Sequence, residues 1–313
     1  MANKKKEIIL ADSGVDYDPE PHLYFYKGKQ LKGITGTLIE RAYPKGDTYK
    51  NISDEVLNHA ADRGSACHQA VGNYYDIGIS STGYEDIVRK AKELLESQDL
   101  TPIRFEYVVT DYKNYASPID IVCVNAKNEI CIVDMKFTAK LHYPQVTLQT
   151  SIYKRWFTLV NPKLTAKHQY VLWIHTNDDH EVLDNGIFEL DTVDDAFIDD
   201  LIDCDTNDKT FDIGKYYGDL PRKVADVEGY LVKLQQLVKE KTEEMDNIKA
   251  GLCELMEKYN VKQYSSAHIQ LTRVAPKPRV SFDTTRFKKE HEDMYNEYTK
   301  TSEVKPSVKI TIK

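Results

Sequence analysis

Two apolar segments near the middle of the chain, residues 119–124 and 130–137, have the pattern of β-strands. Both are rich in β-branched residues, and a short polar stretch between them supplies a turn. A carboxylate interrupts each segment, Asp120 near the start of the first and Asp134 late in the second. The flanking residues are nearly all apolar, so we expect both strands to be buried. A buried charge must be paired or bind a metal, which makes the two aspartates candidates for a functional site.

Lys136 lies two residues beyond Asp134, so the two side chains should project from the same face of their strand. Two carboxylates on neighbouring strands can hold a divalent cation, and a lysine beside them can stabilise the anion that forms when water attacks phosphorus. An aspartate and a lysine at this spacing also occur often as exposed charges on a half-buried sheet. This short pattern alone therefore leaves both interpretations open.

The hydrophobic spacing on either side predicts an α/β fold, with helices flanking a mixed central sheet. Apolar residues three and four apart predict helices over residues 53–77, 84–98 and 143–159. Runs of β-branched and aromatic residues predict further strands over 103–110 and 167–175, and a hairpin over 22–32. The core is thus expected to run as helix, three strands, helix and strand.

A few polar residues stand out within these elements. Glu106 lies in the first predicted strand of the core, next to the strand of Asp120. His68 lies in the first helix, where a single histidine among apolar residues is ordinarily part of the core. Gln149 and Tyr153 are four residues apart in the last helix of the core, so they share one helix face. The role of each depends on what faces it in the fold.

A different pattern begins near residue 224. From there to residue 260, apolar residues alternate at spacings of four and three over about five heptads, broken only at Lys241. This pattern predicts a long helix that packs against another helix, either within its own domain or in a second subunit. A homo-oligomer formed through residues 224–260 is therefore one expected assembly.

The segment after the long helix predicts a small α+β tail with a hairpin over residues 261–274 and a short helix over 283–298. Its basic residues are candidates for contact with phosphate groups: Arg279, Arg286, Lys288 and Lys289. We therefore divide the chain into a first domain, residues 1–220, and a C-terminal extension, residues 221–313.

The net charge of −8 is distributed unevenly. Residues 177–212 form an acidic segment of fourteen acidic residues and one basic residue, with helical spacing of its apolar residues. Residues 261–313 have eleven basic and six acidic residues, and the rest of the chain is neutral. The acidic segment is most simply a solvated helix face, so the basic tail can still face phosphate groups.

The five cysteines, at positions 67, 123, 131, 204 and 253, contain no C-x-x-C pair. This distribution suits buried thiols in a reducing cytosol and argues against disulfides, zinc or an iron–sulfur cluster. No apolar run approaches the roughly 20 residues of a membrane span, and residues 8–11 are too short for a secretory signal. We expect a cytoplasmic protein with no membrane partner.

Four short motifs occur in chain order: Gly64-x-x-x-His68, Pro118-x-Asp120, Asp134-x-Lys136 and Gln149-x-x-x-Tyr153. Together, over about residues 22–175, they resemble the RecB-like branch of the PD-(D/E)XK nucleases, and most of all the phage recombination exonucleases. The lead-in Ala116-Ser117-Pro118 is similar to the YqaJ and λ-exonuclease branch, although many relatives have glycine where this chain has Pro118-Ile119 before the first aspartate. The tail is similar to the C-terminal extensions of phage-encoded exonucleases.

The resemblance implies a restriction-endonuclease-like core within a nuclease domain. It implies that His68, Asp120 and Asp134 are metal ligands together with the main-chain carbonyl of Met135, with Glu106 as a weaker candidate. Lys136 would position the attacking water or stabilise the transition state. Gln149 and Tyr153 would brace the site or touch the DNA backbone. Arg63 would contact a terminal phosphate, unless it forms a surface salt bridge.

The activity implied by the resemblance is exonucleolytic hydrolysis of linear duplex DNA with one or two Mg²⁺ or Mn²⁺ ions. Its setting would be phage-type end resection for recombination in a bacterial host cytosol, with a single-strand annealing protein as a candidate partner. The iron–sulfur members of the family use four cysteines in an arrangement that this chain lacks, so no cluster is expected. Two alternatives remain: a structure-specific or nicking DNA endonuclease, and a non-catalytic DNA-binding or assembly module.

Overall fold

The computed structural model describes residues 8–18, 21–44, 53–217, 221–266, 269–274, 278 and 281–300. The chain divides into two compact units, Met1–Lys233 and Leu234–Lys313. The long helix α7 (Pro221–Lys258) spans the boundary between them.

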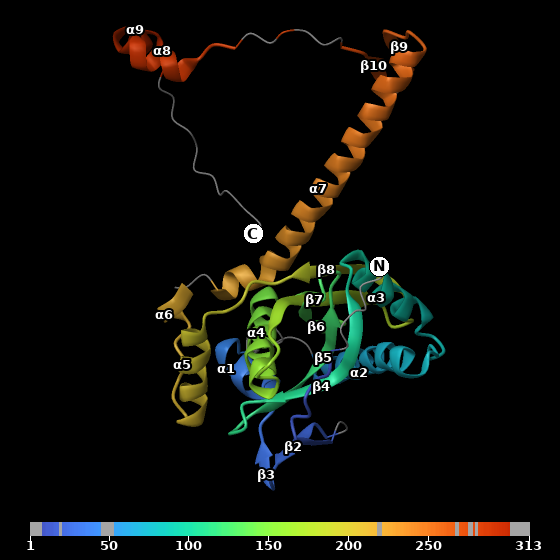
Figure 1. Cartoon of the computed structure of the whole chain (residues 1–313), viewed down its shortest axis with the longest axis vertical. Helices are drawn as coiled ribbons and strands as arrows, with labels where there is room; N and C mark the ends of the chain where they lie inside the picture. Colours follow the sequence, from blue (N-terminus) through green and yellow to red (C-terminus); the bar gives the residue numbers. More distant parts are fainter. Residues whose placement is uncertain are drawn as a thin grey trace. The chain divides into compact units, whose positions relative to one another are not determined.

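A five-stranded mixed sheet forms the centre of the first unit (Figure 1). Its strands, in spatial order, are β4 (Thr101–Thr110), β5 (Ala116–Val124), β6 (Ile130–Lys136), β7 (Ala166–Thr176) and β8 (Val182–Glu189). Strands β4, β5 and β6 are antiparallel to one another, β6 and β7 are parallel, and β8 is antiparallel to β7. Helix α4 (Tyr143–Val160) forms the crossover that the parallel pair requires. The predicted mixed sheet is thus confirmed.

Helices cover both faces of this sheet. Trp156 and Phe157 of α4 pack on one face, in the same apolar cluster as Ile132. Helices α2 (Asp54–Ile77) and α3 (Glu85–Ser97) pack on the other face. Because both faces are covered, almost every residue of β5 and β6 is buried, as their continuous apolar sequences predicted.

Local signals define the ends of α2. The Ser53 hydroxyl accepts a hydrogen bond from the Val56 N–H, which satisfies one free donor of the first turn. Gly78 ends the helix at φ 74°, a left-handed conformation that glycine adopts without steric cost, and its N–H bonds to the Tyr74 carbonyl. The helix predicted over residues 53–77 is therefore confirmed almost to the residue.

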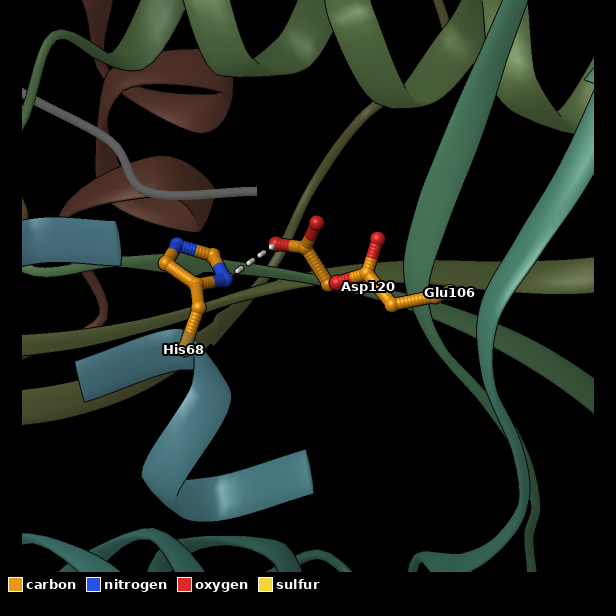
Figure 2. A group of neighbouring side chains, drawn as sticks. All are labelled: His68, Glu106 and Asp120. Carbon is orange, nitrogen blue, oxygen red and sulfur yellow. Dashed lines mark ion pairs between the residues drawn. The ribbon is translucent and has the colours of Figure 1, made fainter. Parts of the chain in front are cut away.

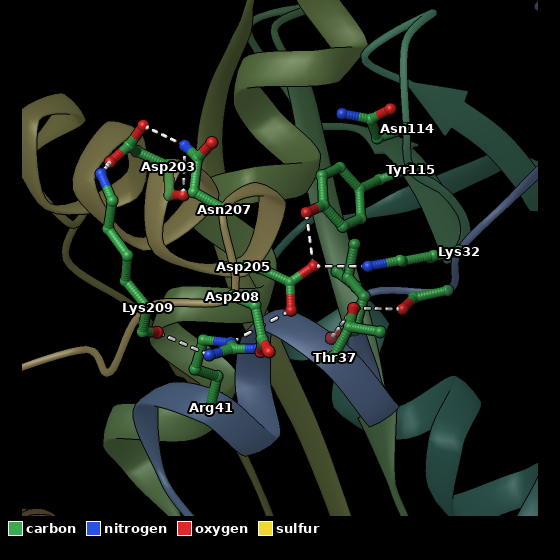
Figure 3. Close-up of polar contacts among 12 residues, drawn as sticks. Lys32, Thr37, Arg41, Asn114, Tyr115, Asp203, Asp205, Asn207, Asp208 and Lys209 are labelled. Atoms are coloured by element: carbon green, nitrogen blue, oxygen red, sulfur yellow. Dashed lines mark hydrogen bonds and ion pairs between the residues drawn. The ribbon is translucent and has the colours of Figure 1, made fainter.

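Within the acidic segment, α5 (Asp195–Thr206) buries Phe197, Ile198 and Leu201 and turns most of its carboxylates to solvent, as the solvated-face interpretation predicted. Asp205 is the exception, because its side chain is buried among partners from the N-terminal region (Figure 3).

Three groups meet the Asp205 carboxylate. Oδ2 accepts hydrogen bonds from Lys32 Nζ at 2.9 Å and from the Tyr115 hydroxyl at 2.6 Å, and Oδ1 accepts one from Arg41 Nε at 3.1 Å. Burial alone would raise the pKa of Asp205, but these partners reverse the effect and lower it. The network fixes α5 beside the short helices η1 (Thr35–Ile39) and α1 (Glu40–Ala42).

Two strands of the first unit were not predicted. Strand β8 lies inside the acidic segment, where Asp184, Asn185 and Gly186 interrupt the apolar pattern. It is an edge strand, so pairing with β7 and the burial of Ile187 and Phe188 are enough to hold it. A small N-terminal sheet contains the predicted hairpin, formed by β2 (Leu23–Tyr26) and β3 (Lys29–Leu31), and an additional strand, β1 (Asp16–Asp18).

The second unit contains the remainder of α7 and a small tail. The tail elements are β9 (Gln263–Ser265), β10 (Gln270–Thr272), α8 (Thr284–Glu290) and α9 (Glu292–Tyr298). A single helix over 283–298 was expected, but His291, at φ −140°, separates two helices. The chain also contains the short helix α6 (Gly214–Tyr217) in the first unit.

The apolar stripe predicted along α7 is exposed to solvent in the second unit. Val238, Met245, Ile248 and Leu255 each leave more than half of their surface accessible. Within the described residues, no helix combines the length and apolarity needed to cross a membrane.

Candidate metal and phosphodiester site

Three carboxylates lie at one level across β4, β5 and β6. The β5–β6 ladder pairs Ile121 with Val133, so Asp120 and Asp134 occupy the next position on each strand. The β4–β5 ladder pairs residues on either side of Glu106 with residues on either side of Asp120. Residues far apart in sequence therefore converge because of strand register.

Glu106 interrupts the regular alternation of β4. Its φ is +46°, in the left-handed region that non-glycine residues seldom adopt. As a result, Phe105 packs with the cluster beneath α2 and α3, whereas Tyr107 packs with the cluster beneath α4. Such a conformation costs on the order of 1–3 kcal/mol, and strained residues of this kind are enriched at active sites and ligand clamps.

Asp120 is the central carboxylate of the site. It is buried, and its Oδ2 accepts a hydrogen bond of 2.6 Å from the Met135 N–H. The same oxygen lies 3.6 Å from Nδ1 of His68, whose ring points toward it from α2 (Figure 2). Ligand atoms of His68, Glu106 and Asp120 all lie within 4.8 Å of one another. This is the spacing of groups that could share one cation.

Asp134 forms the other half of the site. It is fully buried, and its Oδ2 lies 2.5 Å from Nζ of Lys136, in agreement with the predicted shared strand face. Its Oδ1 is buried and has no hydrogen-bond partner among the described residues. A buried acceptor without a partner costs about 1–3 kcal/mol unless a cation or water meets it.

Burial and mutual repulsion disfavour negative charge in the metal-free site. Burial and the charges of Asp120 and Asp134 raise the pKa of Glu106 to about 8. Burial also raises the pKa values of Asp120 and Asp134 to about 6, although Lys136 acts in the opposite direction. Burial would lower the pKa of Lys136, but the charges of Asp134 and Asp120 outweigh it and raise that pKa.

The same surroundings keep His68 neutral. Burial and the Lys136 charge lower its pKa to about 4, against the opposing influence of Asp134 and a hydrogen bond with the Met135 backbone. A neutral imidazole retains a lone pair for a metal. The donor set of one imidazole and two carboxylates, beside the unsatisfied Asp134 Oδ1, therefore fits a divalent cation such as Mn²⁺ or Mg²⁺.

Gln149 and Tyr153 lie beneath the carboxylates. Gln149 Nε2 donates to the Tyr153 hydroxyl at 2.7 Å, and the Ser117 hydroxyl is 3.3 Å from the same oxygen. Burial raises the pKa of Tyr153 well above its usual value, and the charges of Asp134 and Asp120 add to the rise. Tyr153 is only 2% exposed, so its position suits bracing rather than contact with DNA.

The structure describes four of the five residues predicted to contact DNA. Arg63 forms an ion pair with Asp178, the salt-bridge alternative considered from the sequence. In α8, Arg286 pairs with Glu290 at 2.9 Å, whereas Lys288 and Lys289 are exposed. Arg279 lies outside the described residues.

The position of the N-terminal sheet near the site was not predicted. Tyr17 and Tyr24 both have raised pKa values, chiefly through burial, and the charge of Glu106 contributes to each. The signal that could have drawn attention to this region is a group of aromatic residues followed by three lysines, all after His22.

Comparisons with known proteins add little to this description. No family model matches the chain, and no curated protein matches it. Among solved structures, the chain is similar to one described as "Crystal structure of SSO0001", at 15% sequence identity and a TM-score of 0.33. That similarity covers 59% of this chain and 79% of the other. Function must therefore be argued from the residues themselves.

Proposed function

We propose that this protein is a divalent-metal-dependent deoxyribonuclease that hydrolyses linear duplex DNA from its ends. The observation that carries the proposal is the convergence of His68, Glu106 and Asp120 beside the Asp134–Lys136 pair. The exonuclease assignment rests on the resemblance to the RecB-like phage recombination exonucleases. The order of β4 to β8, with its single parallel crossover, supports the proposal of a restriction-endonuclease-like core.

Several residues of the site are candidate ligands for the cation. His68, Glu106 and Asp120 would hold the cation, with Asp134 Oδ1 and the Met135 carbonyl as further candidate ligands. When bound, the cation supplies Lewis-acid stabilisation of charge that develops on the phosphate oxygens. The carboxylates would then be ionised at neutral pH, since a cation offsets the repulsion that raises their pKa values.

Lys136 is the positively charged donor of the site. Its side chain is partly exposed while Asp134 anchors its ammonium group, so it can face an incoming phosphate. From there it would orient the attacking water or stabilise the negative charge of the transition state. Tyr153 and Gln149 hold the α4 side of the site in place through their mutual hydrogen bond.

The reaction class can be tested with linear and covalently closed circular duplex DNA, each incubated with purified protein in Mg²⁺, Mn²⁺ or EDTA. We expect progressive loss of the linear duplex with either metal and none in EDTA, while the closed circle stays intact. Cutting of the closed circle would instead identify an endonuclease. DNA binding without cleavage in either metal would favour a non-catalytic DNA-binding module and contradict the proposal.

A further inference from the structure

The hairpin formed by β2 and β3 carries positive charge in a chain that is acidic as a whole. Residues 21–33 contain three lysines, at positions 27, 29 and 32, one histidine and no acidic residue. Three consecutive aromatic residues, Tyr24, Phe25 and Tyr26, precede the first of these lysines. Basic and aromatic residues in one short element suit contact with a nucleic-acid strand.

This hairpin packs directly on the strands that carry the site. Tyr24 and Leu31 form an apolar cluster with Ala116 of β5, and Val108 of β4 packs against it. Val108 is two residues from Glu106. Backbone hydrogen bonds also join Lys32 to the start of β5, since the Ala116 N–H donates to the Lys32 carbonyl at 3.0 Å. The hairpin is therefore fixed to the strands of the carboxylate cluster.

Polar contacts connect the hairpin with the interior of the site. The rings of Tyr17 and Tyr24 stack 4.9 Å apart and nearly parallel, at 4°. The Tyr24 hydroxyl interacts with Tyr17 and with Ser117, and Ser117 contacts Tyr153. Side chains of the small sheet thereby reach the bracing residues of α4.

The outer side of the hairpin is open to solvent. His22 is exposed, and its Nδ1 lies 3.2 Å from the Tyr17 hydroxyl. Lys27, also exposed, occupies the turn with its ammonium group 5.0 Å from the centre of the Tyr26 ring. By contrast, Lys29 is held by the Lys113 carbonyl at 2.6 Å, and Lys32 by Asp205. Lys27 and His22 are thus the groups best placed to meet a ligand.

We propose that this hairpin is a DNA-binding element of the nuclease unit, with Lys27 and His22 contacting backbone phosphates of the strand that enters the site. The inference rests on the proposed function, because it takes DNA as the ligand. Its physical reason is electrostatic: DNA is a polyanion, so a positively charged side chain beside the carboxylates of the site helps to hold the strand.

Binding of an end-labelled duplex, measured by fluorescence anisotropy in EDTA at several salt concentrations, tests this element without cleavage. Lys27→Glu should weaken binding about 10-fold and lower the salt slope by about one. Lys27→Arg, which keeps the charge, should bind like the wild type. Lys163→Glu is the matched control, because Lys163 is an exposed lysine after the far end of α4. We expect its binding to stay within about twofold of the wild type.

The outcomes separate the two proposals. Equal binding by Lys27→Glu and Lys163→Glu would contradict the proposed DNA-binding role of the hairpin. The nuclease proposal would be unaffected. Weakened binding by Lys27→Glu, together with no cleavage by the wild type in Mg²⁺ or Mn²⁺, would support the DNA-binding role of the hairpin. The same result would contradict the proposed nuclease activity. Absence of any DNA binding by the wild type would contradict both.

Discussion

At the residue scale, the site concentrates groups that oppose the stability of the metal-free protein. Glu106 adopts a left-handed backbone conformation, and three carboxylates stand at one level of the sheet. Asp134 also buries an acceptor that has no hydrogen-bond partner in the part of the chain that the structure describes. Each feature costs free energy of folding, and each would be offset by a bound cation. In the proposed metal site, binding of the cation would offset this loss of stability in exchange for an arrangement of ligands that is ready before the cation binds.

Glu106→Gln tests this exchange. The pKa of Glu106 is about 8 in the folded protein and near 4.5 in an unfolded chain. Between pH 4.5 and pH 8, the folded protein therefore binds more protons than the unfolded chain does. The free energy of unfolding should therefore fall as pH rises across this window. The metal-free variant has no carboxyl proton to lose, so at pH 8 it should be more stable than the wild type by about 1 kcal/mol. The figure is reduced because a large part of the Glu106 surface remains accessible to solvent despite the burial that raises its pKa. Urea denaturation in EDTA at pH 5 and pH 8 measures the difference, and equal pH dependence of the two proteins would contradict the account.

His68→Gln tests the ligand role of the imidazole. We expect Mn²⁺ affinity, measured by calorimetry, to fall at least about 10-fold. Cleavage should be lost, while the free energy of unfolding changes by no more than about 1 kcal/mol. His59→Gln is the control on the same helix, at an exposed position, and should bind Mn²⁺ like the wild type. An unchanged Mn²⁺ affinity in His68→Gln would show that His68 is not a metal ligand and would favour its interpretation as a core residue.

At the scale of elements, β5, β6, α2 and α4 could be predicted because their signals are local. Continuous apolar runs define the two central strands, and a serine cap and a glycine mark the ends of α2. Three features could not be predicted, because each depends on tertiary contacts. The edge strand β8 lies in an acidic sequence. The backbone conformation of Glu106 reverses which side chains of β4 face each side of the sheet. Asp205 has hydrogen-bond partners more than 80 residues away in the sequence.

Asp205 offers a direct test of how α5 is held. Asp205→Asn removes a buried charge that meets Lys32, Arg41 and Tyr115, so we expect a loss of about 3 kcal/mol in the free energy of unfolding. Asp208→Asn is the matched control: Asp208 contacts the same Arg41 at 3.5 Å, but its side chain is 97% exposed. Its change should have no measurable effect in urea denaturation. Equal effects of the two substitutions would show that the buried network does not hold α5.

At the scale of the whole molecule, the second unit leaves an apolar stripe of α7 exposed to solvent. Val238, Met245, Ile248 and Leu255 follow the heptad spacing, and nothing within the described part of the second unit covers them. Apolar side chains in this arrangement gain about 25 cal/mol per Å² when a second helix removes them from water. The sequence predicted the stripe correctly, but heptad spacing does not specify the partner.

Sedimentation equilibrium tests whether the partner is a second copy of the chain. We expect the wild type to sediment as an oligomer, and the double change Ile248→Asp and Leu255→Asp to sediment as a monomer. Ala250→Asp is the control, since it adds the same charge to an exposed position off the stripe of the same helix. A monomeric wild type, or an oligomer unaffected by the double change, would contradict self-association through α7.

We propose that the carboxylates at the level of Asp120 perform metal-dependent hydrolysis of DNA. The most direct measurement is the initial rate of nucleotide release from linear duplex DNA in Mn²⁺ by Asp120→Asn and by Asp62→Asn, an identical change at an exposed position on α2. The account predicts a fall of at least about 1000-fold for Asp120→Asn and a wild-type rate for Asp62→Asn. Equal rates for the two variants would contradict it.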